Sequence, residues 1–284
     1  MKDSFKNSDF QKQFEENGYV TIPLLSEPEI ESLLQFFQSQ VSEISEVFHT
    51  SHFSSNTAYK QAVHDKIVDV VFKKAANFLT PHIPVFGNFM VKQPNSKVYM
   101  QLHADWAYVE ETQYRGISIW LPLVDTTKIN GCLGVLPGSH KVLNAVRGPG
   151  IKQSSYKSDA LWVKKFGNLL PMKAGEAIFY DHALMHYSPS NKSGKVRPAI
   201  NLSIVPQSAE IIHYSLPGGE GDTIEKYTVN DPSFFINYTH FQRPESAIPV
   251  SFIPLQTVVH IDNRMKDFKS SIPENWLKSL LRYF

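Results

Sequence analysis

Residues 196–206 read VRPAINLSIVP, and apolar and polar side chains alternate along this segment. Ile200 and Leu202 fall on one face of an extended chain, whereas Arg197 and Asn201 fall on the other, because successive side chains of a strand point to opposite faces. A strand with one apolar and one polar face suits a barrel whose mouth holds a polar site. The segment therefore predicts a β-barrel with Arg197 on its polar face.

Short apolar runs separated by glycine and proline fill much of the chain from residue 83 to residue 206. Runs of this length that are bounded by turn residues are typical of strands. The predicted strands are Ile83–Lys92, Lys97–His103, Gly116–Val124, Gly131–Leu136, Ala177–Tyr180 and Val196–Pro206. Many short strands with turn signals between them favour a double-sheet jelly roll. In the strand that ends near His103, the alternation puts Gln101, His103 and Asp105 on one face and Met100 on the other.

The first 82 residues are predicted to be mainly helical. Ser26-Glu27-Pro28-Glu29 is a capping box with proline in the first turn. The apolar residues that follow it at helical spacing are Ile30, Leu33, Leu34, Phe37 and Val41. A second amphipathic helix is predicted over Ile67, Val70, Val71, Phe78 and Leu79. We expect both helices to pack on the outside of a sheet.

Composition and charge exclude several classes of protein. The net charge is +1 without a Lys/Arg run, which argues against a nucleic-acid partner, and no apolar run is long enough to span a membrane. The single cysteine, Cys132, excludes an internal disulfide and fits a reducing cytoplasm. Hydrophobic residues make up 42%, enough for a substantial core. We interpret residues 1–284 as one domain with a jelly-roll core over 83–206; the oligomeric state cannot be read from the sequence.

Three pieces of the sequence together predict a metal site. His103-Ala104-Asp105 is followed far downstream by His186, and Arg197 comes eleven residues after that histidine. Two histidines and one carboxylate are the donor set of the facial triad that holds Fe(II) and leaves coordination positions open. Arginine offers the planar fork that clamps a carboxylate in bidentate fashion. The residues therefore indicate an iron site beside a clamp for a carboxylate-bearing co-substrate.

A histidine and an acid two residues apart are weak evidence alone. With 11 histidines and 27 acidic residues, about one such match is expected by chance, and His260-Ile261-Asp262 is a second match that we interpret as structural. Only His186 among the histidines has an arginine eleven residues later. The alternatives are a non-catalytic, cupin-like metal-binding jelly roll and a cupin-like isomerase or hydrolase. Arg197 argues against both, because neither needs a dicarboxylate clamp.

On these residues the chain resembles the phytanoyl-CoA dioxygenase family of Fe(II)/2-oxoglutarate oxygenases. The resemblance runs from Phe14-Glu15-Glu16-Asn17-Gly18-Tyr19-Val20 to about Pro206. The other segments that carry it, in the family's order, are His103-Ala104-Asp105, Asn130-Gly131-Cys132-Leu133-Gly134-Val135-Leu136-Pro137-Gly138-Ser139-His140, Gly175-Glu176 and His186-Tyr187-Ser188 through Arg197. It implies a double-stranded β-helix with helices over one sheet.

The resemblance also implies roles for individual residues. His103, Asp105 and His186 would bind Fe(II), and Arg197 would pair with the distal carboxylate of 2-oxoglutarate. Positions that contact the co-substrate or line the pocket in relatives are matched by Ser188, Gln101 and Trp120. The implied reaction uses O2 to oxidise, most simply to hydroxylate, an unactivated carbon of a small molecule, with release of succinate and CO2.

The sequence does not identify the substrate. Family substrates include acyl thioesters, amino acids and specialised metabolites, and the family does not choose among them. Residues 141–168 and 207–245 match the family poorly and are possible lids, because long segments between core strands often cover an active site. Aromatic residues that could line a pocket or belong to the core are Trp106, Tyr108, Trp162, Tyr227, Phe234, Phe235 and Tyr238.

Overall fold

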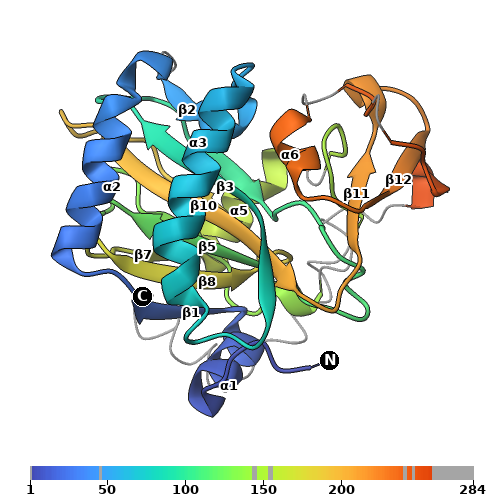
Figure 1. Cartoon of the computed structure of the whole chain (residues 1–284), viewed down its shortest axis with the longest axis horizontal. Helices are drawn as coiled ribbons and strands as arrows, with labels where there is room; N and C mark the ends of the chain where they lie inside the picture. The colour runs from blue at the N-terminus through green and yellow to red at the C-terminus, as the bar shows by residue number, and fades with distance from the viewer. Residues whose placement is uncertain are drawn as a thin grey trace.

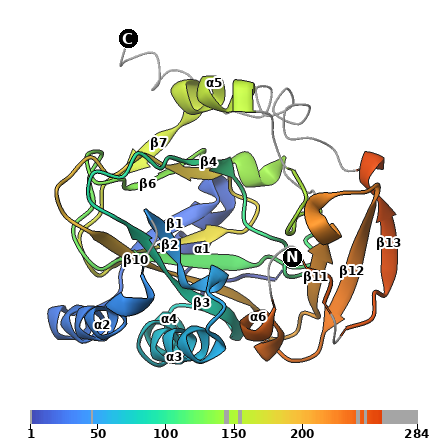
Figure 2. The ribbon, with the colours of Figure 1, turned by 90° about the horizontal axis from the view of Figure 1, so that it is seen from above.

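Two antiparallel sheets face each other in the computed structural model, which describes residues 2–44, 47–142, 146–152, 156–238, 242–244 and 247–257 (Figures 1 and 2). The larger sheet has the order β1-β8-β5-β10-β3-β2. Its strands are β1 (Tyr19–Pro23), β8 (Glu176–Asp181), β5 (Ile117–Pro122), β10 (Arg197–Pro206), β3 (His82–Lys92) and β2 (Phe48–Thr50). The smaller sheet, of order β4-β9-β6-β7, contains β4 (Met100–His103), β9 (His186–Ser188), β6 (Leu133–Val135) and β7 (Asn168–Leu170).

The alternation of apolar and polar side chains over residues 196–206 decides which face of the larger sheet the helices cover. Ile200, Leu202 and Ile204 are fully buried against the helical layer. Arg197 and Asn201 lie on the opposite side and line a cavity between the two sheets. The apolar face therefore packs outside the barrel, and the polar face lines its interior.

The helices of the first part cover the outer face of the larger sheet, as the sequence predicted (Figures 1 and 2). They are α1 (Ser8–Asn17), α2 (Glu27–Ser39), η1 (Val41–Glu43), η2 (Ser51–Phe53), α3 (Thr57–Ile67), the π-helical turn η3 (Val68–Phe72) and α4 (Lys73–Ala75). The predicted capping box forms at the start of α2, where the Ser26 amide and hydroxyl donate to Glu29 at 2.9 and 2.7 Å. Glu29 thus satisfies an amide that the helix itself leaves unpaired.

Two helix boundaries were predicted wrongly. Val41 lies beyond α2 and is 60% exposed, so the apolar stripe ends one turn earlier than expected. The second helix begins at Thr57, because the Asn56 side chain caps it by accepting from the Tyr59 amide at 3.1 Å. It continues through η3 to the end of α4, so Phe78 and Leu79 lie past its end.

All of the predicted strands form, but the sequence missed several short ones. The missed strands of the two facing sheets are β1, β2, β7 and β9. Strands of three to five residues carry too few alternating side chains to stand out, and their pairing comes from segments far away in the chain. β9 matters most among them, because it carries His186.

A third sheet lies beside the barrel and occupies much of one segment predicted as a possible lid (Figure 2). Its strands are β11 (Ile211–Ser215), β12 (Thr223–Val229) and β13 (Ser251–Pro254), with η5 (Pro217–Gly219), α6 (Ser233–Asn237) and η6 (Leu255–Thr257) around them. Tyr227 and Phe235 are fully buried, so these aromatic side chains belong to the core. Tyr108 packs in a cluster with Phe235, and its carbonyl accepts from the Ile212 amide at 2.9 Å.

The other possible lid begins at the last residue of η4 (Ser139–Lys141) and contains α5 (Tyr156–Phe166). Phe166, with Trp162 beside it, packs against Leu102 of β4, so α5 covers the outer face of the smaller sheet (Figure 2). A lid movement of either segment stays a prediction. Within the described residues, no helix is long and apolar enough to cross a membrane.

Candidate metal centre

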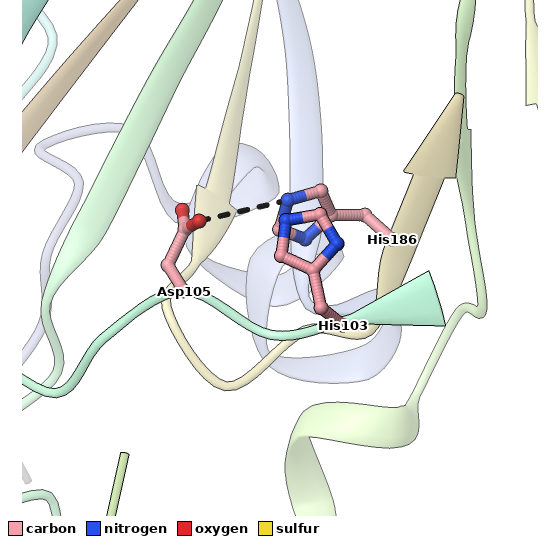
Figure 3. A group of neighbouring side chains, drawn as sticks. All are labelled: His103, Asp105 and His186. Atoms are coloured by element: carbon pink, nitrogen blue, oxygen red, sulfur yellow. Dashed lines mark ion pairs between the residues drawn. The ribbon is translucent and has the colours of Figure 1, made fainter. Parts of the chain in front are cut away.

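The structure brings the three predicted ligands together between the sheets (Figure 3). His103 ends β4, Asp105 follows two residues later, and His186 begins β9 directly opposite His103 in the ladder. One candidate ligand atom from each residue lies within 4.8 Å of the others, and Asp105 Oδ1 is 3.6 Å from His186 Nε2. Three donor atoms this close together can hold one ion.

Hydrogen bonds orient each donor toward the common centre. His103 Nδ1 lies 2.7 Å from the Gln101 carbonyl oxygen, and His186 Nδ1 lies 3.0 Å from the Leu184 carbonyl oxygen. A carbonyl oxygen only accepts, so each Nδ1 carries the proton and each Nε2 keeps a lone pair for a metal. Ser118 Oγ donates to Asp105 Oδ2 at 2.5 Å, which leaves Oδ1 available.

The charges also suit a divalent cation. Burial, together with repulsion from the neighbouring His186, lowers the pKa of His103 to about 4, although Asp105 and the Gln101 carbonyl act in the opposite direction. Burial opposes ionisation of Asp105, but His186, His182 and His103, with the Ser118 hydrogen bond, hold the pKa of that carboxyl below its usual value. At neutral pH His103 is therefore a neutral donor and Asp105 an anionic one, the states in which these groups bind metals.

Arg197 lies in the cavity that contains the triad. Its side chain is 2% exposed, its guanidinium lies 5.7 Å from the centre of the Trp120 ring, and Nη1 donates a long hydrogen bond of 3.4 Å to the Met90 carbonyl. Nε has no hydrogen-bond partner, and within the described residues no carboxylate forms an ion pair with Arg197. A buried cation without a counter-ion is costly, which indicates that an anion completes this site.

Lys92 is a second buried basic residue in the same cavity, and the sequence analysis missed it. It ends β3 directly opposite Arg197 in the ladder. Its Nζ donates to the Ser188 hydroxyl and carbonyl, both at 2.9 Å, and to the Pro189 carbonyl. Burial and, to a smaller extent, repulsion from Arg197 together lower the pKa of Lys92 to about 7. The sequence feature that could have revealed this residue is a lysine at the end of a predicted strand.

The remaining predicted residues divide into two groups. Ser188 and Trp120 line the cavity beside Arg197. Gln101 does not: its side chain is exposed, and Met100 lines the cavity instead. Strict alternation placed Gln101 wrongly, because the pairing of β4 with β9 is irregular between Met100 and His103. His260-Ile261-Asp262 lies outside the described residues.

A family model described as phytanoyl-CoA dioxygenase (PhyH) matches residues 14–199, well over half of the chain. The chain belongs to the phytanoyl-CoA dioxygenase family. The match contains His103, Asp105, His186 and Arg197, and it ends two residues past the arginine. The resemblance inferred from the sequence is therefore confirmed, whereas the roles of the individual residues remain predictions.

Similar proteins support the family over part of their length. A "Phytanoyl-CoA dioxygenase" of Arabidopsis thaliana is 33% identical over 120 residues, which cover 41% of this chain and 42% of the relative. "Phytanoyl-CoA dioxygenase 1" of Oryza sativa subsp. japonica is 26% identical over 196 residues, 60% of this chain and 68% of the relative. The chain thus spans less than half of the first relative and about two thirds of the second.

Solved structures show the same fold. The "non-heme alpha ketoglutarate dependent carbocyclase SnoK from nogalamycin biosynthesis" has a TM-score of 0.52 at 19% identity, over 72% of this chain and 86% of that one. EctD from S. alaskensis, solved "with 2-oxoglutarate and 5-hydroxyectoine", has a TM-score of 0.52 at 20% identity, over 72% of this chain and 78% of that one. The predicted double-stranded β-helix is confirmed.

Proposed function

We propose that the chain is an Fe(II)- and 2-oxoglutarate-dependent dioxygenase that oxidises a carbon of a small molecule. The observation that carries the proposal is the location of Arg197, a buried cation without a counter-ion in the cavity that contains the triad. A metal site alone would not require that cation. A co-substrate that chelates the metal at one end and carries a carboxylate at the other would use both the metal site and the buried arginine.

The residues present fit both the iron ion and 2-oxoglutarate. His103, Asp105 and His186 present the two imidazole nitrogens and one carboxylate oxygen typical of non-haem Fe(II). Arg197 would take the distal carboxylate of 2-oxoglutarate, with Lys92 supplying further positive charge nearby. When bound, iron and 2-oxoglutarate supply the activation of O2 that oxidises an unactivated carbon, with release of succinate and CO2.

The chain's own contribution is binding, orientation and the exclusion of water. The Ser118 hydrogen bond fixes one carboxylate oxygen of Asp105, so the other stays directed at the metal position. Lys92 fixes Ser188 next to Arg197, and the Trp120 ring lies beside the guanidinium. These contacts shape the anion site before the co-substrate arrives, which lowers the cost of binding it.

The alternative functions for this fold give no reason for the buried Arg197 side chain. A non-catalytic metal-binding jelly roll, or a cupin-like isomerase or hydrolase, would use the triad but would have no need of a buried cation beside it. A short match to a "Probable alpha-ketoglutarate-dependent hypophosphite dioxygenase" of Stutzerimonas stutzeri, 32% identical over 77 residues, agrees with the oxygenase reading.

The substrate belongs to a broad class: an acyl thioester, an amino acid or a specialised metabolite. The aromatic residues of the third sheet do not narrow it, because Tyr227 and Phe235 are buried in the core. A cytoplasmic location is part of the proposal and rests on Cys132, which is a buried free thiol in keeping with a reducing compartment.

An anaerobic titration tests the function. Fe(II) is added to metal-free protein, then 2-oxoglutarate, and the visible spectrum is recorded. A weak iron-to-ligand charge-transfer band that needs both additions, and that is lost in His186→Ala, is expected. Succinate release would then serve to screen substrates. If iron is bound to folded protein and no band appears, 2-oxoglutarate does not chelate there and the dioxygenase proposal fails.

A further inference from the structure

The backbone of the Asp105 ligand is held by a side chain from a distant segment. Asp105 lies two residues beyond the end of β4, outside the ladder that β4 forms with β9. Arg147 Nε donates a hydrogen bond of 2.6 Å to the Asp105 carbonyl oxygen. Close by, the Ala107 amide donates to the Arg147 carbonyl oxygen at 3.2 Å. Arg147 thus takes the place of a strand partner for the chain around Asp105.

The Arg147 side chain is itself fixed. It is 1% exposed, and it forms a bidentate pair with Glu111, in which Nη1 is 2.7 Å from Oε2 and Nη2 is 2.5 Å from Oε1. Two parallel hydrogen bonds set the plane of the guanidinium and therefore the direction in which Nε points. The carboxylate also neutralises the buried cation, so Arg147, unlike Arg197, needs no ligand to balance its charge.

The segment that carries Arg147 packs against the third sheet. Gly148 has no space for a side chain, because a Cβ there would lie 1.9 Å from the Tyr214 carbonyl oxygen of β11. The Leu216 amide, just past β11, donates to the Pro149 carbonyl at 3.0 Å. The third sheet, the Arg147 segment and the Asp105 backbone therefore form one continuous set of contacts.

We propose that Arg147 is a positioning residue that sets the metal affinity of the triad by holding the Asp105 backbone. The proposal rests on the metal site of the proposed function. Ser118 fixes the Asp105 carboxylate and Arg147 fixes the Asp105 backbone, so the ligand is restrained at both ends. Groups that orient a ligand commonly change metal affinity by about 10- to 100-fold when removed. The third sheet, through Arg147, then supports the metal centre and is not merely an appendage to the barrel.

The test is a Co(II) titration of metal-free protein, followed by visible d–d absorption, and it needs no substrate. The double variant Arg147→Met/Glu111→Gln removes both charges, so no buried charge is left unpaired. Arg147→Lys keeps the cation but cannot reproduce the fork. The control is Arg243→Met/Glu225→Gln, which removes a more exposed ion pair between Arg243 and Glu225 of β12, whose Nη2 and Oε1 atoms are 2.6 Å apart.

Both Arg147 variants are expected to raise the Kd for Co(II) by about 10-fold and to change the d–d intensities, whereas the control stays within about 2-fold of wild type. Circular dichroism checks that each variant folds. If the double variant does not fold, the Kd of Arg147→Lys for Co(II) tests the proposal. A wild-type Kd in Arg147→Lys, or an equal rise in the control, overturns the proposal. If the wild-type protein itself binds no Co(II), the proposed metal site fails and this inference fails with it.

Discussion

Replacing Arg197 with methionine should make the ligand-free protein more stable while removing its affinity for 2-oxoglutarate. Burial lowers the pKa of Arg197 to about 10. Since one pKa unit corresponds to about 1.4 kcal/mol, the charged side chain carries a penalty of about 3 kcal/mol in the folded protein at neutral pH. At that pH the arginine is charged in both the folded and the unfolded protein, so the whole penalty counts.

The substitution also removes favourable contacts. The guanidinium lies 5.7 Å from the centre of the Trp120 ring, a contact worth about 1 kcal/mol. The 3.4 Å hydrogen bond to the Met90 carbonyl is too long to contribute much. The net gain in the free energy of unfolding is therefore about 2 kcal/mol, or roughly 4 °C in Tm for a chain of this size. A side chain retained at such a cost is typical of a functional site.

Calorimetry of the metal-free protein measures the first effect, and the anaerobic 2-oxoglutarate titration measures the second. Loss of one partner of a buried charge pair should weaken 2-oxoglutarate binding by at least about 30-fold. Arg197→Lys is the control: it keeps a buried cation, so it should give no such gain in Tm, and it should still weaken 2-oxoglutarate binding because lysine lacks the planar fork. The reasoning is refuted if Arg197→Met lowers the Tm by several degrees, or if it binds 2-oxoglutarate as tightly as wild type.

Three further predictions concern Asp105 and Lys92, which line the cavity, and Ser118, which donates to Asp105. Asp105→Ala should abolish coupled turnover, measured as succinate release; full activity at normal iron content would show that this carboxylate is not a ligand. Ser118→Ala should raise the Kd for Co(II) by about 10-fold, because the Asp105 carboxylate then loses the hydrogen bond from Ser118 that orients it; an unchanged Kd would contradict the orienting role. Because burial lowers the pKa of Lys92 to about 7, the unfolded chain binds one more proton than the folded protein at higher pH, up to the ordinary pKa of lysine. The stability of the ligand-free protein should therefore rise as the pH increases from about 7 to about 10, and denaturant unfolding should show that Lys92→Met flattens this rise relative to wild type.

The residues of the candidate metal centre could be predicted from the sequence because the types of side chain and their spacing are local properties. The alternation over residues 196–206 placed Arg197 on the inner face of β10, as the structure shows. The capping box at Ser26 and the two buried helical stripes followed from the same kind of local pattern. The jelly roll, the family and the three residues of the triad were therefore within reach of the sequence.

What the sequence could not show depends on contacts between segments far apart in the chain. Lys92 meets Ser188 from 96 residues away, and Arg147 meets Asp105 from 42 residues away. The irregular pairing beside β4, which turns Gln101 outward, is likewise a property of two strands and not of one. Local patterns report which face of an element a side chain occupies. Only the packing of elements decides which side chains meet there, and so only the tertiary structure shows Lys92 in the cavity and Arg147 bonded to the Asp105 carbonyl.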